Sequence, residues 1–362
     1  MKSLVLISLI LVLSNLAFSW EIKLIKKIPV EDGAVLASVS FVVLEDGNFI
    51  FADFKDKDNQ IKVINQEGKL IKTWGKMGPG PDEFNGASFL DYQKPYLAVA
   101  DAGKYRIYVY ENIMGYEFKK IGGILAWERE GPIKIYLNNV LIPGYVVSSA
   151  GKKFMLFMKD FNDRKTEYIL PLENVYGARS IQEYKKIVEE AGFVLSIPFI
   201  DVYEDTIFYV RDKRLKVDKI DLKLKNLEII GEEPKNFRAL SVDKKTKNRL
   251  MDAKNQKSKK ELDEIISRHS FVSGLVADKN FVAVIYVNKE RRIREEFYWV
   301  PYVQIYDYSG KVLHEQSLEP CFSSDRVIPL YYEKDKRQLY LCSIISNEAA
   351  YQYEIYKFLV EQ

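Results

Sequence analysis

The sequence predicts an all-β protein, a six-bladed β-propeller whose last blade is closed by an N-terminal strand. Three observations lead to this fold class. The chain has the composition of a globular protein and is rich in β-forming aromatic residues, with 24 Tyr and 20 Phe among 362 residues. A pattern of short strands and tight turns recurs along the chain. Finally, the two ends offer complementary strands that together complete one blade.

The strand pattern is clearest in two consecutive copies, residues 45–75 and 94–122. In the first copy a Gly-Asn turn leads into a strand at 49–54, and an alternating strand, a turn at Gly68 and a last strand follow. The second copy repeats the same order of strands and glycine-containing turns. Both copies are therefore expected to form β-meanders of four short strands.

Weaker copies continue to the C-terminus and bring the number of expected blades to six. The second strands of the copies align near six apolar residues: Ile50, Leu97, Leu141, Ile207, Val282 and Leu339. The early spacings approach the 40–45 residues of a four-stranded propeller blade. The later spacings are longer, and we expect two helical insertions between blades, at about 180–193 and 241–270, where apolar residues recur at helical spacing.

The ends of the chain predict how the ring closes. The last copy supplies three strands, near 327–333, 338–344 and 351–360, and lacks an outermost strand. Residues 21–28, EIKLIKKI, form an additional strand before the first strand of blade one at 40–44. We therefore expect the N-terminal strand to pair with the last strand of the chain, which also protects sheet edges that would otherwise be exposed.

The first 19 residues are expected to be a signal peptide. Lys2 provides a positive charge, residues 4–13 are almost all apolar, and a small-residue cleavage site ends at Ser19. Cleavage there leaves residues 20–362 as an exported propeller, either periplasmic or secreted. The apolar run is shorter than the roughly 20 residues of a membrane span, although an uncleaved anchor is the alternative. No comparable run follows, so we expect no membrane span in the mature chain.

The charge balance argues against a nucleic-acid partner. The chain carries a net charge of +3 with 29% charged residues. Basic clusters at 244–260 and 291–294 lie among acidic residues, and we interpret them as solvated surface. We expect the protein to be a monomer.

The chain contains two cysteines, Cys321 and Cys342. An oxidising compartment after export would permit a disulfide between them. The alternative is two buried thiols that pack as small apolar side chains.

The stretch GKMGPGPDEF, Gly75–Phe84, is the most unusual part of the sequence. A phosphate-binding P-loop would need Gly-x-x-x-x-Gly-Lys-Ser/Thr at the start of a helix, whereas here a proline follows the last glycine and a strand comes next. We interpret the stretch as the crossover from the outer strand of one blade to the inner strand of the next, shaped by its glycines and prolines. Phe84 is expected to be buried between the two blades, with Asp82 and Glu83 accepting hydrogen bonds nearby.

Around this stretch the sequence resembles NHL-repeat propellers and the related exported bacterial six-bladed β-propeller proteins. Their repeats show a Gly-rich segment that ends in Gly-Glu-Phe, a strand that ends in Val-x-Asp, and then Arg-Ile. The matching residues here are Asp82-Glu83-Phe84, Ala100-Asp101 and Arg106-Ile107. Asp82 stands where the pattern has Gly, and the later copies keep the strand order without these motifs. The resemblance implies a propeller but no single function, because propellers serve many functions.

The candidate ligand-binding residues lie at strand ends and in the crossover: Asp53, Asp82, Glu83, Asp101 and Arg106. Asp53 and Asp101 occupy equivalent places at the ends of second strands. Two interpretations are open. The two carboxylates belong to a ring that binds a cation or a polar ligand, or each one caps the turn that follows it.

No recognisable catalytic set accompanies these residues. His269 and His314 have no Cys or His partner at the spacing of zinc ligands, and no Gly-x-Ser-x-Gly motif occurs. The sequence therefore favours a binding module without a cofactor, for an envelope or extracellular protein, peptide or glycan partner. The alternative is a lactonase- or lyase-type enzyme with a metal ion, such as calcium, in the central channel.

Overall fold

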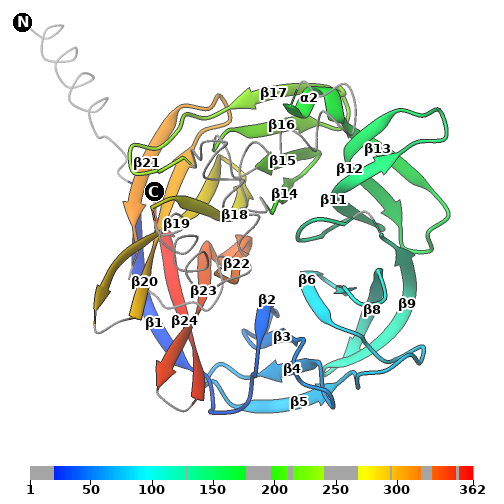
Figure 1. Cartoon of the computed structure of the whole chain (residues 1–362), viewed down its shortest axis with the longest axis vertical. Helices are drawn as coiled ribbons and strands as arrows, with labels where there is room; N and C mark the ends of the chain where they lie inside the picture. Colours follow the sequence, from blue (N-terminus) through cyan, green and yellow to red (C-terminus); the bar gives the residue numbers. More distant parts are fainter. Residues whose placement is uncertain are drawn as a thin grey trace, which may run out of the picture.

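The computed structural model describes residues 20–127, 129–176, 197–210, 215–239, 268–293, 296–318, 328–347 and 350–361. These residues form six four-stranded antiparallel sheets, which are arranged radially as the blades of a propeller (Figure 1). The predicted fold class is therefore confirmed. In each blade the first strand lies nearest the centre of the ring and the fourth strand forms the rim.

The strands of each blade follow one another along the chain, except in blade 6. Blade 1 is formed by β2 (Ser38–Val43), β3 (Phe49–Asp53), β4 (Ile61–Ile64) and β5 (Leu70–Trp74). Blade 2 is formed by β6 (Ala87–Gln93), β7 (Tyr96–Asp101), β8 (Arg106–Met114) and β9 (Glu117–Leu125). Blade 3 is formed by β10 (Lys134–Tyr136), β11 (Asn139–Val147), β12 (Lys153–Asp160) and β13 (Thr166–Pro171). Blade 4 is formed by β14 (Phe199–Tyr203), β15 (Thr206–Val210), β16 (Val217–Asp221) and β17 (Asn226–Ile230). Blade 5 is formed by β18 (Ser270–Asp278), β19 (Phe281–Ile293), β20 (Glu296–Tyr306) and β21 (Val312–Ser317). Blade 6 is formed by β22 (Leu330–Glu333), β23 (Gln338–Asn347), β24 (Ala350–Glu361) and β1 (Glu21–Pro29). The described helices are short: α2 (Leu172–Tyr176) and the 3₁₀ turn η1 (Lys334–Lys336).

The six residues at which the sequence copies align all lie in second strands, namely β3, β7, β11, β15, β19 and β23. The helical insertions expected at about 180–193 and 241–270 fall mostly on residues 177–196 and 240–267, which lie outside the described residues, so they stay predictions. No helix in the described ranges is long and apolar enough to cross a membrane.

The hydrophobic core is divided among the spaces between neighbouring blades. The described residues form six apolar clusters, and each cluster joins two adjacent blades. Strand β3 shows why, because successive side chains of a strand point to opposite faces of the sheet. Phe49 and Phe51 pack toward blade 6, whereas Ile50 and Ala52 pack toward blade 2. A strand buried on both faces is apolar at nearly every position, as the sequence FIFA shows.

The predicted closure of the ring is confirmed. Strand β1 pairs with β24 in an antiparallel register that places Ile22 opposite Val360 and Ile28 opposite Ile355. In Figure 1 the blue strand β1 lies beside the red strand β24 at the rim. The side chain of Gln316 in blade 5 also holds β1, since it bonds both the N–H (3.0 Å) and the carbonyl (2.8 Å) of Ile22.

The stretch Gly75–Phe84 is the crossover between blades 1 and 2, as predicted, because it connects β5 to β6. Phe84 is buried and packs edge-on against Tyr108, with 5.7 Å between the ring centroids. Gly75 has a φ of 84°, and a Cβ atom there would lie 2.5 Å from the Phe84 ring. Lys104 fixes the rest of the stretch by donating to the carbonyls of Gly80 and Glu83, both at 2.7 Å.

The antiparallel order gives the propeller two different faces. We call the face with the turns between strands 1 and 2 and between strands 3 and 4 the hairpin face. The crossover face carries the connections between strands 2 and 3 and from strand 4 to the next blade, including Gly75–Phe84.

Candidate functional site

Asp53 and Asp101 each hold the chain just before the inner strand of their own blade. Asp53 accepts hydrogen bonds from the main-chain N–H groups of Leu36 (2.6 Å) and Ala37 (2.9 Å), which precede β2. Asp101 accepts one from the N–H of Asn85 (2.9 Å), which precedes β6, and one from the turn that follows β7 (3.1 Å). Both residues are buried. In both blades the aspartate therefore stabilises the main chain that leads into the inner strand. A role of these two carboxylates in ligand binding stays a prediction.

The charge of Asp53 is balanced inside blade 1. The ammonium group of buried Lys62 lies 2.9 Å from the carboxylate of Asp53 and 2.9 Å from that of Asp56. Burial alone would raise the pKa of Asp56, but the hydrogen bonds from Lys62 and from two main-chain N–H groups outweigh burial and lower it. This cluster therefore holds two carboxylates and one ammonium in direct contact.

The other three predicted residues lie on the crossover face. Asp82 is exposed, with its carboxylate 3.8 Å from the ammonium of Lys120. Glu83 accepts a hydrogen bond from the N–H of Gly80 at 2.7 Å and so stabilises the crossover itself. Arg106 is exposed at the start of β8, and its side chain makes no hydrogen bond or ion pair with another described residue.

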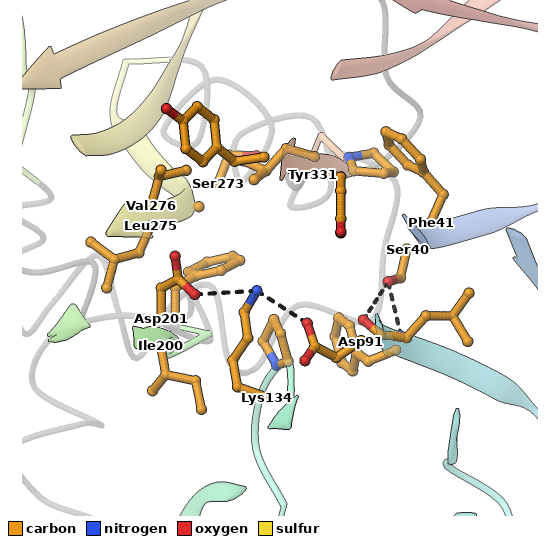
Figure 2. A pocket seen from close by; sticks show the side chains of 18 of the residues that line it. Ser40, Phe41, Asp91, Lys134, Ile200, Asp201, Ser273, Leu275, Val276 and Tyr331 are labelled. Carbon is orange, nitrogen blue, oxygen red and sulfur yellow. Dashed lines mark hydrogen bonds and ion pairs between the residues drawn. The ribbon is translucent and has the colours of Figure 1, made fainter. Parts of the chain in front are cut away.

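A different set of residues lines a cavity on the propeller axis. The cavity consists of two adjoining pockets, one of about 420 Å³ at the hairpin face and one of about 80 Å³ nearer the crossover face, and Asp91, Lys134 and Asp201 line both. In each blade, the first strand (the inner strand) pairs with the second strand. The residue that lies two positions before the final paired residue of the inner strand is equivalent in all six blades. These six equivalent residues all line the cavity (Figure 2): Phe41, Asp91, Lys134, Asp201, Val276 and Tyr331.

The charged members of this set are adjacent. Asp91, Lys134 and Asp201 come from blades 2, 3 and 4, whereas blades 5, 6 and 1 contribute apolar or aromatic side chains. The ammonium of Lys134 lies between the two carboxylates, 3.2 Å from Asp91 and 3.4 Å from Asp201 (Figure 2). At the level of these six residues, one half of the wall is therefore charged and the other half is apolar or aromatic. At the hairpin face, Glu45, Glu333 and Lys334 add charges from blades 1 and 6.

Both aspartates are also held by the main chain of the next blade. Asp91 accepts a hydrogen bond from the N–H of Ile135 in blade 3, and Asp201 accepts one from the N–H of Ala277 in blade 5, both at 2.7 Å. Charge-assisted bonds of this kind are stronger than neutral ones. The carboxylates therefore have fixed positions on the cavity wall and connect neighbouring blades at the same time.

The charges of the cavity reinforce one another. Burial alone would lower the pKa of Lys134, but the carboxylates of Asp201 and Asp91 outweigh burial and raise it above its usual value. Burial would likewise raise the pKa of Asp201, but Lys134 and Lys334 outweigh burial and lower it. Lys134 and Asp201 are therefore both ionised throughout the neutral range.

The mouth of the cavity on the hairpin face is formed partly by η1 and the end of β22. The ammonium of Lys334 lies 3.6 Å from Asp201 and donates to the carbonyl of Val202 at 2.5 Å. The hydroxyl of Tyr332 donates to Asp278 at 2.6 Å. Burial raises the pKa of Tyr331, so its hydroxyl stays neutral. A ligand at the mouth would meet ammonium, carboxylate and phenol groups.

The described residues offer no group of three or more His, Cys, Asp and Glu side chains that could hold a metal ion. In the cavity, the ammonium of Lys134 occupies the space between the two carboxylates. The histidines lie elsewhere: His269 contacts the carbonyl of Ala239, and His314 contacts Gln316, both at 3.1 Å. Calcium in the channel stays the untested alternative to a binding module without a cofactor.

Cys342 lies buried in β23. Cys321 falls outside the described residues, so a disulfide between the two cysteines also stays a prediction.

The sequence analysis missed the charged residues of the axial cavity, although a signal for them exists. In copies 2, 3 and 4 a charged residue stands among apolar or aromatic residues of the inner strand, in FLDY, KIY and FIDVY. Aligning the copies on the turn that follows the inner strand places Asp91, Lys134 and Asp201 at one position. Alignment of the copies on their second strands does not reveal this equivalence, because the turn between the first two strands varies in length from blade to blade.

Fold and cavity together define a class of protein, a six-bladed β-propeller with a partly charged axial cavity. Among solved structures, the chain is similar to a protein of Bacteroides fragilis NCTC 9343 assigned as exported, with a TM-score of 0.54 and 14% identity, covering 93% of this chain and 94% of that one. It is also similar to the Cps50 (Swd1) β-propeller domain of Myceliophteria thermophila, with a TM-score of 0.43 and 8% identity over 93% and 99% of the two chains. No family model and no curated protein matches the sequence. At 14% identity, the likeness to the Bacteroides fragilis protein shows the fold alone.

Proposed function

We propose that the protein is an exported binding module that holds a protein, peptide or glycan partner at the axial cavity. The observation that carries this proposal is the cavity itself, which opens on the hairpin face with a volume of about 420 Å³. Ligand pockets usually have about 300–1,000 Å³, with a few polar groups placed among apolar ones. This cavity has that character, because its charged and phenol groups lie among apolar side chains such as Val43 and Leu44.

The fixed charges of the cavity support binding over acid–base catalysis. A general acid or base works best when its pKa lies near the working pH. The pKa of Lys134 is raised and that of Asp201 is lowered, so each moves away from neutrality. Such groups are suited to orient a polar ligand rather than to exchange a proton with it.

Export is supported by the leader-like residues 1–19 and by the likeness to the Bacteroides fragilis protein assigned as exported. The NHL-type motifs around Gly75–Phe84 support a place among exported bacterial propellers. The partner is therefore an envelope or extracellular molecule, and the protein acts as a monomer in the periplasm or outside the cell.

The proposal is tested with the chain from Trp20 to Gln362, screened against a peptide library and an oligosaccharide library. Binders are then measured with two cavity variants, Lys334→Met and Tyr331→Phe, which remove a polar group while keeping most of the side-chain volume. We expect the affinity to fall about tenfold in at least one of them, because a ligand group in the cavity loses its partner. Lys119→Met is the matched control, since Lys119 is exposed on the outer strand β9.

If a ligand binds the parent protein and both cavity variants with the same affinity, the axial cavity is not its binding site and the proposal is refuted. Metal analysis of the purified chain, together with thermal melts with and without EDTA, tests the enzymatic alternative. A stoichiometric metal ion that raises the melting temperature would favour a lactonase- or lyase-type enzyme.

A further inference from the structure

A stacked pair of aromatic side chains, Tyr105 and Trp127, is exposed on the crossover face, opposite the mouth of the axial cavity. Tyr105 lies in the turn between β7 and β8, and Trp127 lies in the connection from β9 to β10. Their ring centroids are 4.5 Å apart and their planes differ by 21°. The two residues are 48% and 60% exposed, so the outer face of the stack is accessible to solvent.

The backbone around the pair is held in place. The N–H of Ala126 donates to the carbonyl of Tyr105 at 2.9 Å, which joins the two connections directly. On the other side, the N–H of Leu125 donates to Asp163 at 3.0 Å, and its carbonyl accepts from Lys159 at 2.8 Å. Two large rings are therefore presented on a rigid support, and little conformational entropy is left to lose on binding.

The backbone conformation of Tyr105 is a second indication. Its φ is 52°, in the left-handed region, where glycine or asparagine is the usual residue. An exposed tyrosine at such a position costs free energy, and its ring stacks on Trp127. Such strain is found most often at functional sites.

We propose that Tyr105 and Trp127 form a platform that binds a pyranose ring of a glycan. One flat face of many pyranoses carries several C–H groups, which pack against the electron-rich face of an aromatic ring. Arg106, the next residue along the chain, is exposed, and its side chain has no hydrogen bond or ion pair with another described residue, so this connection also carries a free cation.

A peptide is the weaker candidate for the occupant. Peptides usually bind along a free sheet edge or in an apolar groove, where their main chain or side chains are enclosed. The Tyr105–Trp127 stack lies in connections between strands and presents the flat face of a ring instead. This platform is a second site, separate from the axial cavity, and therefore stands or falls independently of the proposed function.

The test uses the chain from Trp20 to Gln362 with chitohexaose, cellohexaose and an oligogalacturonide as probes in isothermal titration. We expect at least one of the three to bind, with affinity about tenfold weaker in Trp127→Ala and less affected in Trp127→Phe. Trp74→Phe is the matched control, because Trp74 also stacks on an aromatic ring, Phe118, at 5.2 Å but is only partly exposed. Its affinity should equal that of the parent.

Three results would overturn the proposal. The first is that none of the saccharides binds. The second is that Trp127→Ala, with an unchanged melting temperature, binds as well as the parent. The third is that an oligoproline peptide binds at Trp127 while the saccharides do not, which would make the occupant a peptide. Lys119→Met, at an exposed residue of the outer strand β9 and outside both sites, should not change saccharide binding.

Discussion

The ammonium of Lys134 is expected to be the main electrostatic support of the axial cavity. Lys134→Met keeps most of the side-chain length but leaves the carboxylates of Asp91 and Asp201 without their shared cation, which lies 3.2 and 3.4 Å away in the parent protein. Removing one partner of a buried ion pair costs about 3–5 kcal/mol.

Two observations place the expected loss at the lower end of this range. The side chain of Lys134 is 26% exposed, so water screens part of the interaction. Asp201 also keeps a second cation, Lys334, at 3.6 Å. We therefore expect Lys134→Met to lower the free energy of unfolding by about 3 kcal/mol. This corresponds to a fall in melting temperature of about 5 °C for a chain of this size.

The loss should depend on pH. Asp201 has a lowered pKa in the folded protein, so its contribution is present above its unfolded pKa of about 4 and is lost as the pH falls through the folded value. Lys134 has a raised pKa, so its contribution is present below its unfolded pKa of about 10.4 and is lost as the pH rises through the folded value. The difference between parent and variant should be largest between these limits and should shrink in acid.

The assay is thermal or denaturant unfolding of the parent, Lys134→Met, Lys119→Met and the double variant Lys134→Met/Asp91→Asn. Asn at position 91 keeps an oxygen for the N–H of Ile135 but carries no charge, so the double variant should recover about half of the lost stability. Lys119→Met controls for the loss of a surface lysine. The reasoning is refuted if Lys134→Met is as stable as the parent, or if the double variant is no more stable than the single one.

Three further predictions concern the scaffold. Phe84→Ala should lower the free energy of unfolding by about 3–5 kcal/mol in denaturant titrations, because it leaves a cavity between blades 1 and 2, and a loss below that of an ordinary surface substitution would contradict the packing described. Lys62→Met should cost about 3 kcal/mol in the same titration, since the buried carboxylate of Asp53 keeps its N–H donors but loses its cation; equal stability would contradict this account. Deleting residues 20–29 should accelerate hydrogen exchange in β24, which loses its neighbour at the rim, and unchanged protection would show that β1 does not stabilise the last blade.

The sequence was sufficient to predict the ring, and the physical reason lies in the repetition of blades. The second strand of each blade is buried on both faces. The sequence runs around Ile50, Leu97 and Val282 are therefore apolar at nearly every position and are easily aligned. The closing strand could be predicted because residues 21–28 alternate in a way that suits a strand and had no partner in their own copy. Both signals are local patterns that a single sequence contains.

The axial cavity could not be predicted in the same way. Its residues lie in different blades and meet only because the ring brings the inner strands together around the axis. Asp91 and Lys134 look in sequence like single charges in short strands, and nothing local indicates that their side chains meet at 3.2 Å. Asp53 and Asp101 were predicted as site residues because they occupy equivalent positions in two repeats. Equivalent residues in repeats can be alike because they stabilise the same backbone conformation, and not only because they bind the same ligand.

The pairing of β1 with β24 places the first and last strands of the propeller side by side. Glu21 and Glu361 lie opposite each other in the register, so a short peptide could join them as an ordinary hairpin turn. New ends could then be opened at a solvent-exposed turn, such as the one at Gly115. In the natural order, β1 is synthesised first but has no partner strand until β24 has been synthesised, so the ring closes only after all six blades are available.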